Sequence, residues 1–110
     1  MLTVTPDAVT VRLSTFEKLA AFHGDLTVPR SAIVGVNLVH DPMGDVKGFR
    51  APGYSLPGHA KIGTWHRREG RDFVAVHANR PGVELRLTGQ PYQRVLITTD
   101  DPYAVAAQLS

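Results

Sequence analysis

The sequence has 110 residues, the usual length of one domain, and its 43% hydrophobic and 20% charged residues argue against disorder. The absence of cysteine excludes disulfides, thiolate catalysis, cysteine-bound zinc and iron–sulfur clusters, and it fits a cytoplasmic location. The chain has no signal-peptide pattern and no run of 18 apolar residues, so we expect no transmembrane segment.

The positive charge is concentrated in the middle of the chain. Residues 47–80 hold seven Lys or Arg against two Asp or Glu, a balance of +5, within a chain whose net charge is +2. One interpretation is an ordinary solvated face. The other is a surface for an anionic partner such as nucleic acid, a lipid headgroup or an acidic protein, because the Arg fork suits phosphate and carboxylate groups.

The chain opens with a strand pattern. Val9, Val11 and Leu13 alternate with polar residues, which predicts a half-buried strand over residues 8–13.

A short helix is predicted next. Ser14 and Glu17 have the spacing of a capping box, and apolar residues follow at helical spacing up to residue 23. Gly24 is placed to end this helix as its left-handed C-terminal residue.

Two further elements precede the least regular part of the chain. Residues 26–28 predict a short strand, and Pro29 begins a predicted helical turn. Residues 33–40 are apolar on both faces, which predicts a central strand. Residues 41–58 contain four Gly and three Pro, so we expect an irregular loop there, either functional or a plain crossover.

Residues 61–78 predict a β-hairpin that turns at Arg68-Glu69-Gly70. With Gly70 as the left-handed residue of a three-residue turn, two pairs face each other across the hairpin: Trp65 with Phe73, and His66 with Asp72. A two-residue turn would shift these pairs by one.

The last part of the chain predicts two strands, over residues 83–88 and 94–99, and a final helix. Asp101 is the expected N-cap of that helix and Pro102 its first residue. In total the pattern predicts a mainly β fold. About seven strands form an antiparallel meander or barrel, with a helix near residues 14–23 and a short C-terminal helix at an opening.

Three stretches resemble small bacterial pleckstrin-homology-like (PH-like) domains of uncharacterised function. They are residues 28–33, residues 62–65 with 72–73, and residues 95–102. The resemblance implies a single PH-like domain over residues 1–110, built as a β-barrel and used as a binding scaffold for phosphoinositides, peptides or proteins. The basic residues lie on a later hairpin than in lipid-binding members, so the family's lipid site is not carried over.

Residues that point to a reaction are scarce. The five histidines show none of the spacings HxH, HxxxH or HExxH, so we expect no metal and no cofactor. Asp100 and Asp101 are explained by helix capping. His66 beside Asp72 would give an oriented imidazole, and an enzyme using this pair is the least favoured hypothesis.

The sequence therefore predicts a non-catalytic binding module, with a protein or peptide as its partner. The alternative is electrostatic binding of anionic lipid or nucleic acid through residues 47–80. A homo-oligomer formed through a sheet edge is a further expectation. The predicted contact residues are Arg50, Tyr54, Lys61, Arg67, Arg68 and Arg71.

Overall fold

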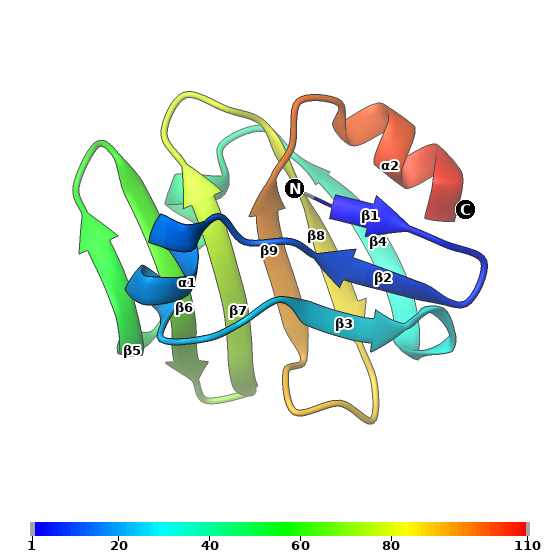
Figure 1. Ribbon diagram of the computed structural model, residues 1–110, viewed down its shortest axis with the longest axis horizontal. Coiled ribbons are helices and arrows are strands. Elements are labelled where there is room, and N and C mark those ends of the chain that lie inside the picture. The colour runs from blue at the N-terminus through cyan, green and yellow to red at the C-terminus, as the bar shows by residue number, and fades with distance from the viewer. Residues whose placement is uncertain (1, 110) are drawn as a thin grey trace.

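In the computed structural model, which describes residues 2–109, the chain forms two sheets and two short helices (Figure 1). The smaller sheet has the strand order β1–β2–β3, and the larger has the order β4–β8–β9–β7–β6–β5. The mainly β prediction, with one helix near the N-terminus and one at the C-terminus, is confirmed. The bounds in chain order are β1 Leu2–Val4, β2 Ala8–Val11, α1 Thr15–Ala21, β3 Leu26–Pro29, β4 Ile33–Val39, β5 Phe49–Leu56, β6 Ala60–Arg67, β7 Gly70–His77, β8 Gly82–Leu87, β9 Arg94–Thr98 and α2 Pro102–Leu109.

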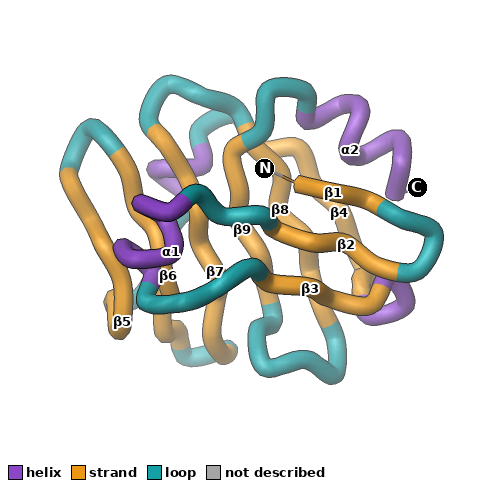
Figure 2. Tube along the Cα trace, in the orientation of Figure 1, coloured by secondary structure: helices purple, strands orange, loops and turns teal. Residues whose placement is uncertain are grey.

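The larger sheet carries a hydrophobic cluster on each face. The smaller sheet lies across one face, which we call the inner face, with α1 over β5 and β6 and α2 at the opposite end (Figure 2). Burying alternate residues of both sheets stabilises this layer. The inner cluster includes Val9, Val11, Val28, Ile62, Phe73, Leu85 and Val95. On the other face, the outer face, residues 42–46 cover a second cluster of Trp65, Val74, Val76 and Leu96.

Both predicted helix caps form. The Ser14 side chain accepts from the Glu17 backbone N–H, and the Glu17 carboxylate accepts from the Ser14 backbone N–H, which completes the capping box. The Asp101 carboxylate accepts from the backbone N–H of Ala104 at 3.0 Å, so it caps α2.

The end of α1 differs from the prediction. The left-handed residue is Phe22, at φ 55°, and not Gly24. The Phe22 N–H bonds back to Leu19 O, so the helix closes two residues earlier than the glycine indicates. A left-handed conformation is strained for a bulky side chain.

The β6–β7 hairpin has a two-residue turn, so the predicted register is wrong by one residue. Gly70 pairs with Arg67 at φ 145°, which lies far from the left-handed helical region that a three-residue turn needs. Trp65 consequently lies opposite Asp72 on the outer face, and Phe73 lies opposite Thr64 on the inner face. His66 pairs with Arg71, so the predicted His66–Asp72 pair does not form.

The predicted irregular loop over residues 41–58 contains regular structure. Pro42–Asp45 is a turn of 3-10 helix, and β5 follows at the edge of the larger sheet. An edge strand tolerates Pro52 because one side of its backbone needs no sheet partner. The register of β5 against β6 shifts between Arg50 and Gly53, so the residues around Pro52 interrupt the regular pairing of the two strands.

The larger sheet is neither an all-antiparallel meander nor a closed barrel. β9 lies between β8 and β7 in the sheet. After β7 the chain skips one strand position to form β8, and it then returns to fill that position with β9. β9 is therefore antiparallel to β8 and parallel to β7. β4 lies at the other edge, so its prediction as a central strand is also wrong. Its apolar residues divide between the inner cluster, the outer cluster and solvent. No helix within residues 2–109 is long and apolar enough to cross a membrane.

Candidate functional site

The six predicted contact residues do not form one surface. Directly opposed residues of neighbouring strands share a face, so register assigns each side chain to a face. Arg50 pairs with Trp65 and belongs to the outer face, as do Lys61 and Arg67 on β6. Tyr54, opposite Ile62, and Arg71, opposite His66, belong to the inner face, and Arg68 lies in the hairpin turn.

Four of the six have partners within the fold, Arg71 among them through the Tyr92 ring. Lys61 Nζ donates to Met43 O at 3.3 Å, which ties the covering segment to β6. Tyr54 packs edge-on against Phe16, with 5.4 Å between ring centroids. Arg67 Nη2 donates to Asp72 Oδ1 at 3.1 Å.

Arg67 belongs to a buried group of charges on the outer face. We call the set of Arg67, Asp72, Glu84 and Arg94 the Asp72 cluster. Asp72 is fully buried, and Arg94 Nε donates to its Oδ2 at 3.0 Å. Arg67 Nε lies 2.6 Å from the same oxygen, as an ion pair whose N–H is not aligned for a hydrogen bond.

Arg94 uses every guanidinium nitrogen inside the fold. Besides Asp72 Oδ2, it donates to Glu84 Oε2 at 2.9 Å and to Asp45 O at 2.9 Å. Burial raises the pKa of Glu84. Hydrogen bonds from Arg94 and Asn37 and the nearby positive charges outweigh burial and hold that pKa below its ordinary value.

The Asp72 cluster is therefore a structural network and no anion receptor. Its members Arg67, Glu84 and Arg94, together with Arg86, line a hollow of about 230 Å³, but Arg94 would have to give up internal partners to bind a ligand there.

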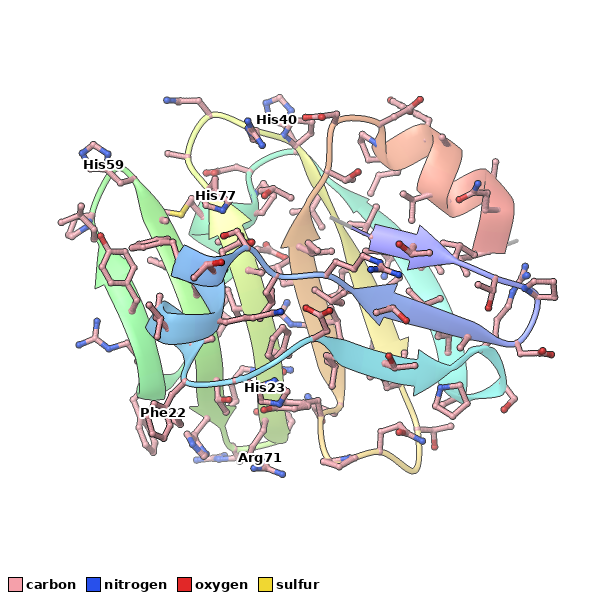
Figure 3. All side chains as sticks on the ribbon, in the orientation of Figure 1. Phe22, His23, His40, His59, Arg71 and His77 are labelled. Carbon is pink, nitrogen blue, oxygen red and sulfur yellow. The ribbon has the colours of Figure 1, made fainter. Side chains whose placement is uncertain are left out.

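The exposed cations among the six predicted residues lie at the hairpin end of the molecule. Arg50 and Arg68 are exposed, and the exposed Arg71 guanidinium lies over the Tyr92 ring, 5.2 Å from its centroid. Phe49 stacks on His66 at the same end, at 5.3 Å between ring centroids. Figure 3 shows Phe22, His23 and Arg71 together at this end of the sheet.

Exposed apolar side chains gather on α1 and the neighbouring strand β5. Phe16 is 53% exposed, Leu19 76%, Phe22 84% and Phe49 68%. Leu56, at the far end of β5, is also exposed. We call these five residues the α1–β5 surface. The sequence predicted the helix, but not that its apolar residues would remain in solvent.

A cleft of about 520 Å³ opens on the inner face, at the opposite end from the hairpin turn. Its wall contains a paired histidine and glutamate that sequence reasoning did not connect. His77 Nε2 lies 2.8 Å from Glu17 Oε2, although 60 residues separate the two. The capping box already explained Glu17, and nothing in the local sequence pointed to His77 as its partner.

Glu17 is ionised at neutral pH. Burial raises its pKa, but hydrogen bonds from His77 and from the Ser14 N–H, with the charge of His77, bring that pKa below its ordinary value of 4.5. Within residues 2–109, no three His, Asp or Glu side chains lie close enough to hold a metal ion.

The lowered pKa predicts how stability depends on acid. A carboxyl with a depressed folded pKa stabilises the fold above its unfolded pKa and loses that contribution as pH falls through the folded value. We expect Glu17→Gln, which keeps a capping-box residue, to lower the free energy of unfolding by about 1 kcal/mol at pH 7. The difference from wild type should shrink as pH falls below 4.5, measured by urea unfolding at several pH values. The exposed Asp7→Asn is the control, and a difference that stays constant as the pH falls would contradict the assignment.

Comparison with protein-family models, curated proteins and solved structures finds no match to this chain.

Proposed function

We propose that this protein is a non-catalytic binding module that takes a protein or peptide on the α1–β5 surface. The observation that carries the proposal is the exposure of five large apolar side chains: two from α1, one from its C-cap residue Phe22 and two from the neighbouring strand β5. Contiguous exposed apolar side chains are costly in a monomer and are typical of interaction sites. The PH-like resemblance also implies a binding scaffold, and that family assignment stays a prediction.

Phe22 supports the proposal in a second way. It combines a left-handed backbone with an 84% exposed ring, so it costs stability twice without contributing to the core. Strained, exposed residues of this kind occur at ligand-contact sites, where the bound partner offsets the cost.

The nearby charges indicate the chemistry of the partner. Arg68 and Arg71 lie at the hairpin end beside Phe22 and Phe49, and neither guanidinium has an ion pair with a carboxylate of residues 2–109. A segment with large apolar side chains flanked by Asp or Glu would complement this surface. Arg50 projects from the outer face, so we leave it out of the site.

Substituting Phe22 tests the proposal, because its effects on folding and on binding have opposite signs. We expect Phe22→Gly to raise the free energy of unfolding by about 0.5–1 kcal/mol, since glycine accepts positive φ without strain. The same variant should bind an acidic, aromatic-rich 12-residue peptide at least about tenfold more weakly, because an exposed aromatic anchor is lost. Fluorescence anisotropy over an array of acidic-apolar, basic-apolar and polar peptides measures binding.

Two control variants make the test specific. Tyr103→Ala removes an exposed ring from α2 and should leave peptide binding unchanged. Arg68→Glu with Arg71→Glu should weaken acidic peptides only. Equal binding of basic and acidic peptides would contradict the proposal. Binding to anionic vesicles or single-stranded oligonucleotides that falls steeply with salt would favour the electrostatic alternative instead.

Self-association through a sheet edge also remains a proposal, and we assign it to β4. Residues 33–39 contain no charge and no proline, and Val34 and Leu38 are exposed. The opposite edge, β5, carries Arg50, Pro52 and a register shift, all of which oppose strand pairing. A sedimentation mass of one chain at high protein concentration would rule this pairing out.

A further inference from the structure

The cleft on the inner face has the dimensions and walls of a ligand site. Its volume of about 520 Å³ lies within the range of small-molecule pockets. Apolar side chains from four elements and from the loop before α1 line it: Leu2, Leu13, Ala75, Ile97 and Val105. It is separate from the α1–β5 surface, because Phe16, Leu19 and Phe22 are not among its lining residues.

Topology explains why a cleft forms here. Among the strands of residues 2–109, β7 and β9 are the only parallel neighbours, so the polypeptide leaves both strands at the same end of the sheet. β7 continues towards β8 and β9 towards α2, and the two paths separate. Crevices beyond the carboxyl ends of parallel strands bind ligands in open α/β sheets for the same geometric reason.

His77 presents a hydrogen-bond acceptor at this cleft. The Glu17 carboxylate can only accept, so the hydrogen shared at 2.8 Å is carried by His77 Nε2. In the neutral imidazole, Nδ1 is then an acceptor. No described group bonds to Nδ1, and the His77 side chain is 36% exposed. A ligand atom that meets Nδ1 of the neutral ring is therefore a donor.

The charges around the cleft have the opposite sign to those of the hairpin end. The carboxylates of Glu17 on α1 and of Asp100 and Asp101 before α2 line it, and Arg80 supplies one positive charge. Arg80 Nη1 lies 4.0 Å from Asp100 Oδ1 at the exposed rim. With His77 neutral the lining carries a formal charge of −2, which favours a cation over an anion.

We propose that this cleft binds a small organic amine, with its ammonium group between His77 and the rim carboxylates and a compact apolar body against Leu13, Ile97 and Val105. The negative lining and the apolar walls together select this class.

The test compares three probes of one shape and different charge: cyclohexylmethylamine, cyclohexylmethanol and cyclohexanecarboxylate. Titration followed by amide NMR and calorimetry should show the amine binding at least about tenfold more tightly than the carboxylate. Amide shifts should concentrate at His77, Ile97 and Ala104.

Variants on one helix separate cleft binding from a general surface effect. Ala104 lines the cleft, so Ala104→Leu should abolish amine binding while preserving α2, since leucine is a good helix former. Ala107→Leu, on the same helix but not lining the cleft, should bind the amine as wild type does. Phe22→Gly should leave amine binding unchanged.

Three outcomes would overturn the inference. They are a carboxylate that binds as tightly as the amine, an Ala104→Leu protein that still binds the amine, and amide shifts that spread evenly over the surface. Loss of peptide binding in Phe22→Gly with retained amine binding distinguishes failure here from failure of the proposed function.

Discussion

Asp72→Asn is expected to lower the free energy of unfolding by about 3–5 kcal/mol, because it removes the carboxylate that two arginines share inside the fold. Arg94 is buried and donates to Asp72 Oδ2, and Arg67 contacts both carboxylate oxygens. An amide offers one neutral acceptor, so the variant would leave positive charge uncompensated beneath the covering segment. The loss is a large fraction of the roughly 5–15 kcal/mol that stabilises a typical domain.

Urea unfolding followed by tryptophan fluorescence measures this effect, since Trp65 lies opposite Asp72 on β6. Asp100→Asn is the matched control. That carboxylate is 95% exposed and lies 4.0 Å from Arg80, so its removal should change stability by less than about 0.5 kcal/mol. Equal losses in the two variants would show that the Asp72 cluster does not stabilise the fold beyond a surface ion pair.

The second large effect is expected at Gly63, where the backbones of β5 and β6 lie too close together to admit a side chain. A Cβ on Gly63 would lie 2.5 Å from the Cα of Gly53 and 2.6 Å from the carbonyl oxygen of Pro52, and its φ of 137° is one that side chains rarely adopt. Because the obstruction is backbone, it cannot move aside without breaking the β5–β6 pairing. Gly63→Ala should therefore cost about 2–5 kcal/mol, from conformational strain and overpacking together.

Gly24→Ala is the control for this prediction. A Cβ at Gly24 meets nothing within 4 Å, so alanine there should be neutral or should stabilise the protein by about 0.4–1 kcal/mol. Thermal unfolding of both variants measures the difference in their stability. A Gly63→Ala protein as stable as Gly24→Ala would mean that β5 does not pack on β6 in the register described.

Local sequence predicted the elements whose hydrogen bonds lie within a few residues. The Ser14–Glu17 capping box, the Asp101 cap and the alternating strand at Val9 and Val11 all form as expected, because neighbouring side chains decide them. Where two local signals competed, the prediction failed. Gly70 suited a three-residue turn as well as a two-residue one, and the wrong choice moved His66 away from Asp72.

The prediction from the Gly and Pro residues between positions 41 and 58 was also partly wrong. Their density over residues 41–58 indicated an irregular loop, but an edge strand can accommodate a proline and a bulge that a central strand cannot. Gly53 and Gly63 are needed because two backbones touch, a contact that no local pattern reveals.

The candidate sites depend most on long-range contacts. Sequence alone identified the basic segment and its arginines, but strand register places Arg50 and Arg71 on opposite faces and turns Arg67 towards Asp72. The Glu17–His77 pair required the fold, since residues 60 apart meet only because the first turn of α1, which packs over β5 and β6, comes within reach of the last residue of β7. Composition, capping and strand alternation fixed a mainly β chain with two short helices. The tertiary structure decided which charges are neutralised, which apolar side chains remain in solvent and where a cleft opens, because each depends on which strands are neighbours and not on the residues within any one of them.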